Sequence, residues 1–142
     1  MNKILRMLVT GGAILLCVAA IFVLLVSVSS ATGTTISVQS VDIDGMTPVY
    51  STSVAAGFQF VNDGRVMIHA KNASANTVYM TVTTPYSENG LALADVYVTL
   101  AATTGESMVG PLPTKLFNNS SGYVQVDFSA TTSVTAAAIK LP

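Results

Sequence analysis

The chain has 142 residues, of which 51% are hydrophobic and only 9% are charged, with a formal net charge of −1. This length suffices for one domain of ordinary size and leaves little for a second. Beyond residue 31 there are four basic and seven acidic residues, a formal charge of −3. The four basic residues are scattered, whereas nucleic-acid binding needs clustered Lys or Arg, so the composition argues against a DNA- or RNA-binding protein.

The first 31 residues predict an export or membrane segment. Lys3 and Arg6 precede an uncharged run, residues 7–30, and the next basic residue is Arg65. About 20 uncharged residues are enough for a helix to span a hydrocarbon core. The distribution of positive charge places the C-terminal part outside the cytoplasm. We therefore expect an exported protein, bound to the membrane through residues 7–30 if the segment is uncleaved.

Cleavage is the alternative that the same segment leaves open. Ser29-Ser30-Ala31 supplies the small residues that a signal-peptide cleavage site needs. A pilin-type leader would need a basic residue directly before its cleavage point, whereas Gly11 follows Thr10. We therefore interpret residues 1–31 as a signal peptide or an apolar anchor helix, and residues 32–142 as one domain. Because the only cysteine, Cys17, lies in this segment, the domain is expected to have neither a disulfide nor a cysteine ligand.

Residues from Thr34 onward indicate an all-β domain. Small and β-branched residues dominate, and apolar residues alternate with polar ones, which is the period of a half-buried strand. This alternation predicts strands at 35–43, 54–60, 65–71, 77–83, 94–100, 123–128 and 133–141. Short strands at near-regular spacing, joined by turn-rich segments, are typical of an antiparallel β-sandwich of seven to eight strands, jelly-roll or Ig-like.

Two irregularities interrupt the expected strands. Apolar residues change parity after Val38, which suggests a bulge or bend at Ser40. Gly110-Pro111-Leu112-Pro113 contains two prolines, which cannot donate to a strand ladder. We expect this segment to be an edge or a crossover between two sheets.

His69 is the only histidine and hence the obvious candidate for a catalytic base. It follows the turn Asn62-Asp63-Gly64, in a strand where Val66, Ile68 and Ala70 alternate with polar residues. This alternation predicts that His69 points outward into solvent beside the charged residues. We therefore predict no catalytic residue and no enzyme activity.

The acidic residues also fail to form a known site. Asp42 and Asp44 resemble the start of a calcium loop, but Ser53 stands where that loop requires a glutamate. The other five acids are interpreted as solvated turn or strand-face residues, because their spacing supports no particular carboxylate pair: Asp63, Glu88, Asp95, Glu106 and Asp127. We predict no metal, no cofactor and no small-molecule substrate.

Two groups of polar residues have alternative interpretations. Asn72, Asn118 and Asn119 each begin an Asn-x-Ser triplet in an expected loop, which makes them candidate glycan acceptors or chance triplets of polar turns. The five tyrosines suit either a contact surface or ordinary cross-strand packing: Tyr50, Tyr79, Tyr86, Tyr97 and Tyr123.

Several motifs between Thr34 and Leu141 carry a family resemblance: Asn62-Asp63-Gly64-Arg65, the strand end "HAKN", the run from Gly90 to Asp95, Gly110-Pro-Leu-Pro113 and the closing "VQVDFSATTSVTAAAIKL". With these the chain resembles small β-rich, head-decoration-like proteins encoded near the capsid genes of tailed phages and prophages. The resemblance implies a non-catalytic virion or surface component that decorates a shell. The pattern begins near the first strand, so the apolar N-terminal segment departs from it.

Three functions follow from these observations. The first is a structural virion or surface protein that assembles with copies of itself or with a larger shell. The second is a pilin-like or adhesive filament subunit, joined to its neighbours by helix packing or strand addition. The third is a secreted carbohydrate-binding domain, which is the weakest because the chain has no Trp and few acids.

Overall fold

The computed structural model describes residues 33–53 and 57–142. The predictions of a signal peptide or anchor helix at residues 1–31 lie outside these residues. The described part belongs to one compact unit, Thr32–Pro142. A search of the same residues for a helix long and apolar enough to cross a membrane found none.

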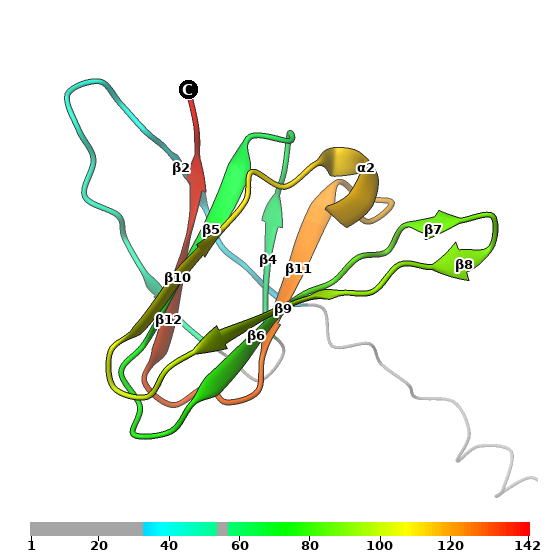
Figure 1. The fold of residues 1–142 in the computed structure, drawn as a ribbon. Helices are drawn as coiled ribbons and strands as arrows, with labels where there is room; N and C mark the ends of the chain where they lie inside the picture. Colours follow the sequence, from blue (N-terminus) through cyan, green and yellow to red (C-terminus); the bar gives the residue numbers. More distant parts are fainter. Residues whose placement is uncertain (1–32, 54–56) are drawn as a thin grey trace, which may run out of the picture. The chain divides into compact units, whose positions relative to one another are not determined.

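The described residues form twelve strands and one short helix, which confirms the all-β class (Figure 1). Several strands are only two residues long. The elements are β1 Thr34–Thr35, β2 Val38–Ser40, β3 Ser51–Thr52, β4 Phe58–Val61, β5 Val66–Asn72, β6 Val78–Val82, β7 Ser87–Glu88, β8 Leu91–Ala92, β9 Val96–Leu100, β10 Gly105–Val109, α2 Thr114–Phe117, β11 Tyr123–Phe128 and β12 Val134–Lys140.

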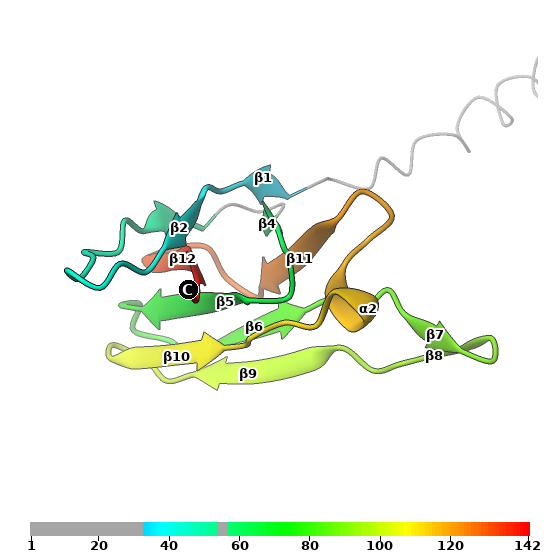
Figure 2. The same cartoon turned by 90° about the horizontal axis from the view of Figure 1, so that it is seen from above.

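Most strands belong to two sheets. Sheet A has the order β1-β4-β11-β6-β9, and sheet B has the order β10-β5-β12-β2, with β3 also paired to β12. Strands β9 and β10 lie next to each other at one side, while β1 and β2 lie at the opposite side (Figure 2). Strands β7 and β8 pair only with each other and form a hairpin that projects away from the two sheets (Figure 1).

The two sheets share one hydrophobic core. Alternate residues of the longer strands face it, as the period of two requires, so that Phe58, Phe60 and Val126 of sheet A pack with Ile68 and Ala136 of sheet B. All five are fully buried. Burial of large apolar side chains at about 1.5–3 kcal/mol each is the main force that holds the sheets together.

The prediction of one antiparallel strand at residues 35–43 is wrong, because two shorter strands, β1 and β2, form there and both pair in parallel. The chain bends after Thr35, so that β1 pairs with β4 while β2 pairs with β12, and both pairs are parallel. The expected antiparallel pairing therefore fails at these two edges, because one segment borders sheet A and then crosses to border sheet B. Pairing ends at Ser40, and Ile43 is 99% exposed in the following loop.

Strand β10 lies where a connector was expected. It pairs with β5 along its whole length, from Gly105 opposite Asn72 to Val109 opposite Ile68. The alternation in β10 is weak, because its inward positions are Gly105, Ser107 and Val109, of which only Val109 has a large apolar side chain. Residues 110–113 then lead from β10 in sheet B through α2 to β11 in sheet A, as the predicted crossover requires.

Candidate functional site

His69 is buried, so the prediction of a solvated histidine is wrong. Its side chain does lie on the face of β5 that points away from the core, as the alternation predicts, but the residue is only 9% exposed. Its Nδ1 is 2.8 Å from the Tyr50 hydroxyl, and its Nε2 is 2.6 Å from Glu106 Oε1. Local periodicity predicts the direction of a side chain but not what covers it.

One partner of His69 lies on β10, which pairs with β5, and the other precedes β3, which lies beyond β12. Tyr50 directly precedes β3, which pairs with β12, and its ring meets the imidazole edge-on with the centroids 5.6 Å apart. Glu106 belongs to β10 and stands opposite Lys71. Because a carboxylate only accepts hydrogen bonds, Nε2 must carry the hydrogen, and in the neutral ring the Tyr50 hydroxyl therefore donates to Nδ1.

Lys71 completes this group, which we call the polar cluster: Tyr50, His69, Lys71 and Glu106. The Lys71 Nζ lies 4.6 Å from the centre of the Tyr50 ring and 3.5 Å from Glu106 Oε1. The interaction with the Tyr50 side chain raises the pKa of Lys71 above its usual value, and the Glu106 carboxylate raises it further. Burial acts in the opposite direction and lowers it.

The polar cluster has the hydroxyl, imidazole and carboxylate order of a hydrolytic triad. A triad histidine is likewise bonded at both ring nitrogens, so the hydrogen bonds do not separate the two arrangements, but the His69 side chain is only 11% exposed. A hollow of about 310 Å³ lies beside the cluster, and it is lined by Lys71, Asn72, Ala73, Thr103, Thr104, Gly105 and Glu106. His69 does not line it. The cluster thus fastens the segment before β3 to the outer face of sheet B.

Four of the other acidic residues have separate local partners. Asp63 accepts from Lys140 Nζ at 2.7 Å and lies 3.6 Å from Arg65. The hydrogen bond with Lys140, and then the backbone N–H of Arg65, lower the pKa of the Asp63 carboxyl. Elsewhere, Asp95 accepts from the backbone N–H of Thr84, Asp127 from the Gln125 amide and Glu88 from the Tyr86 hydroxyl. In residues 33–53 and 57–142, no three His, Cys, Asp or Glu side chains group as metal ligands would.

The three Asn-x-Ser asparagines differ in accessibility. Asn72 ends β5, instead of lying in a loop, and is 2% exposed; its Nδ2 donates to the carbonyls of Asn76, Leu100 and Ala101. Asn118 Nδ2 donates to the carbonyls of Asn62 and Gly122. Asn119 is exposed, and its Oδ1 accepts from two backbone N–H groups. Asn72 and Asn118 therefore act as structural links in the folded domain.

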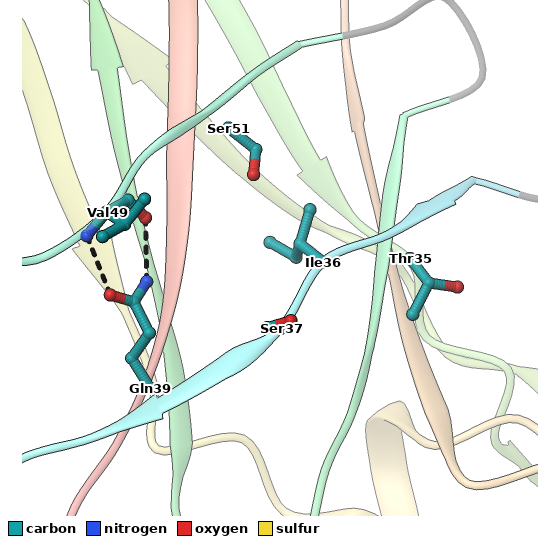
Figure 3. A pocket seen from close by; sticks show the side chains of 6 residues that line it. All are labelled: Thr35, Ile36, Ser37, Gln39, Val49 and Ser51. Carbon is teal, nitrogen blue, oxygen red and sulfur yellow. Dashed lines mark hydrogen bonds between the residues drawn. The ribbon is translucent and has the colours of Figure 1, made fainter.

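A second hollow, of about 390 Å³, lies between β2 and β3 (Figure 3). It is lined by Thr35, Ile36, Ser37, Gln39, Val49 and Ser51. The Gln39 amide donates to the Val49 carbonyl and accepts from the Val49 N–H, both at 2.8 Å. The Gln39 side chain thus makes the two hydrogen bonds that a paired strand would make to Val49. The residues that line the hollow include no charged group that could act in catalysis.

The outer face of sheet A has a different character. Strand β6 directs Tyr79 and Thr81 outward, and the edge strand β9 directs Tyr97 and Thr99 outward; we call these four residues the tyrosine face. Tyr79 is 53% exposed and stands opposite Thr99, while Tyr97 is 71% exposed and stands opposite Thr81. Among the residues that β4, β11, β6 and β9 direct outward, only Asp127 is charged.

The β7–β8 hairpin connects β6 to β9 and has a mixed surface. Leu91 of β8 is 75% exposed and Leu93, just after β8, is 43% exposed, while Glu88 of β7 is also exposed. Monomeric proteins seldom expose large contiguous apolar surfaces without a binding role.

Comparison of the chain with models of protein families, with curated proteins and with solved structures found no match.

Proposed function

We propose that this chain is a non-catalytic structural protein whose domain assembles with copies of itself or with subunits of a larger shell on a virion or cell surface. The observation that carries the proposal is the tyrosine face: outward tyrosine and threonine side chains on two paired strands, without a charge among them, beside a hairpin that exposes Leu91 as well as Glu88. Aromatic residues are enriched and charges depleted at the centres of protein interfaces.

A structural function also fits the buried polar groups. His69 joins Tyr50 to Glu106, is nearly buried and does not line the neighbouring hollow, which supports a role in holding the fold together. The resemblance to phage head-decoration-like proteins points to the same function. In this reading the chain is exported, and residues 7–30, if retained, tie the domain to a lipid layer.

We also assign the domain to the β-sandwiches of jelly-roll or Ig-like kind. Strands β9, β10, β11 and β12 alternate between sheets A and B, as Greek-key connections do. The parallel strands β1 and β2 are then additions to the edges of the sandwich. Such a scaffold presents flat sheet faces, which suits a surface that binds other subunits.

Electron microscopy of the native source with gold-labelled antibodies against the domain tests the function. Label on particle shells or envelopes is expected, label on filaments would favour the pilin-like alternative, and label on neither would contradict both. A Tyr79→Ser variant should be incorporated at least tenfold less, because it removes an aromatic anchor. Met108→Ser is the matched control, since Met108 is 52% exposed but belongs to β10 of the other sheet.

A further inference from the structure

We infer that the free edge of β9 pairs in antiparallel fashion with β9 of a second copy, so that sheet A continues across a two-fold axis. This inference rests on the proposed assembly function and names one of its contacts. The partner is a second copy of this chain, and the groups that bind are backbone N–H and C=O groups.

Hydrogen bonds elsewhere in sheet A identify the groups at this edge. Thr83 N–H donates to Gln125 O, and Ser129 N–H donates to Tyr79 O, so odd-numbered residues of β6 bond to β11. Successive residues of a strand direct their backbone groups to opposite sides. The even-numbered residues Val78, Met80 and Val82 therefore bond to β9.

The register transfers this pattern to β9. Val78, Met80 and Val82 stand opposite Leu100, Val98 and Val96. Val96, Val98 and Leu100 therefore hydrogen-bond to β6 through their backbone N–H and C=O groups. The backbone N–H and C=O groups of Tyr97 and Thr99 point in the opposite direction, away from β6. In the described ranges no turn, loop or cap backbone bond involves Tyr97 or Thr99, and β10, which lies next to β9, pairs with β5 and not with β9. The edge therefore presents two adjacent donor and acceptor pairs.

Strand β9 lacks the features that usually protect an edge. Natural edges are short, or they carry charge, Pro or a bulge. Strands β1 and β3 have two residues each, and β10 carries Glu106, whereas β9 is Val96–Leu100 with neither charge nor proline. An uncharged edge meets an identical copy without repulsion.

The pattern is also complementary to itself. A two-fold axis at Val98 sets Tyr97 opposite Thr99 of the partner subunit, and Thr99 opposite Tyr97 of the partner subunit. All four edge residues then exchange N–H···O bonds, and on the outer face each tyrosine ring lies beside a threonine. Aromatic and β-branched cross-strand pairs of this kind stabilise sheets. The two tyrosine faces become one continuous surface.

Size sets the strength of this contact. Five residues per copy are fewer than the roughly 20–30 that a standard interface takes from each partner. The pair is therefore weak in free solution and forms where many copies are held together, because tethering raises the effective concentration to about the millimolar range. A membrane or a shell provides that condition.

Disulfide trapping tests the register with the full chain in mild detergent, in a Cys17→Ala background. Opposite residues in a bonded pair have Cα atoms about 5.5 Å apart, which a disulfide can bridge, whereas diagonal residues are about 7–8 Å apart. A mixture of Tyr97→Cys and Thr99→Cys chains should form at least fivefold more cross-linked dimer than either variant alone. Equal amounts in all three samples would overturn the inference.

Sedimentation of the protein at about millimolar concentration, where the weak pair is populated, measures the same contact without cross-links. Thr99→Pro removes an N–H that sheet A does not use, so the fold should persist while self-association weakens at least tenfold. Thr99→Val keeps that N–H and should associate like wild type. Association unaffected by Thr99→Pro but lost in Tyr79→Ser would overturn the edge contact and leave the proposed function standing. If the Tyr97→Cys and Thr99→Cys chains cross-link as expected but the gold-labelled antibodies mark neither shells nor filaments, the edge contact would be supported and the proposed function contradicted.

Discussion

The replacement His69→Ala should destabilise the domain by about 2 kcal/mol, although the sequence pattern alone predicts no effect. The bond from the Tyr50 hydroxyl contributes about 1 kcal/mol, and a bond to a carboxylate about 1.5–3 kcal/mol. We take less than the sum of the two because the Glu106 side chain is 52% exposed and can regain water. For a domain of about 110 residues this loss corresponds to roughly 8 °C in Tm.

Thermal and urea melts of the full chain in mild detergent measure this effect. Met108→Ala is the matched control, because Met108 stands opposite His69 but makes none of its hydrogen bonds, and it should change stability by less than about 0.5 kcal/mol. Tyr50→Phe should lose about 1 kcal/mol, and the double variant Tyr50→Phe/His69→Ala less than the sum of the single losses. A His69→Ala chain as stable as wild type would refute the burial of this histidine.

Three further variants probe other parts of the fold. Ile68→Asp should unfold the domain, with a loss above about 4 kcal/mol, because Ile68 is fully buried in the shared core; circular dichroism would detect it. Asn72→Ala should lose about 2–3 kcal/mol in urea melts, because it leaves buried carbonyls without their donor. Asp63→Asn tests the pH dependence of stability. The hydrogen bond from Lys140 lowers the pKa of the Asp63 carboxyl in the folded state, so the ionised carboxyl stabilises the fold. This stabilisation is complete above the unfolded pKa of about 3.9 and is lost as the pH falls through the folded pKa. The variant should therefore show a flatter fall of Tm below about pH 4, and an unchanged acid profile would contradict the pairing.

Periodicity predicted the strands that build the core. β5, β6, β9, β11 and β12 lie within one or two residues of their expected bounds, because alternate apolar residues can be buried only in an extended chain with one face toward the core. The crossover at residues 110–113 was predicted for a similar reason, since proline cannot donate to a ladder. In these segments the local pattern and the tertiary structure require the same conformation.

Features that depend on distant segments were not predictable. β10 has little alternation of its own and is a strand because β5 offers it an open edge. The parallel strands β1 and β2 likewise take their direction from β4 and β12. His69 is covered by Tyr50, 19 residues earlier in the chain, and by Glu106 on the unpredicted β10. The tyrosines could be placed on a strand face from sequence, but their exposure required knowledge of which sheet face stays uncovered.

The two outer faces of the domain differ in how far the chain itself closes them. On sheet B, Ala137 and Ile139 point away from the core yet are buried, and the polar cluster holds the segment carrying Tyr50 against that face. On sheet A, Tyr79 and Tyr97 remain exposed beside an edge with unpaired backbone groups. Ile43, Val49 and Met108 are exposed apolar residues elsewhere, so what sets sheet A apart is the pair of outward tyrosines on its adjacent strands β6 and β9. Contacts with further subunits should therefore concentrate on the tyrosine face and the β9 edge.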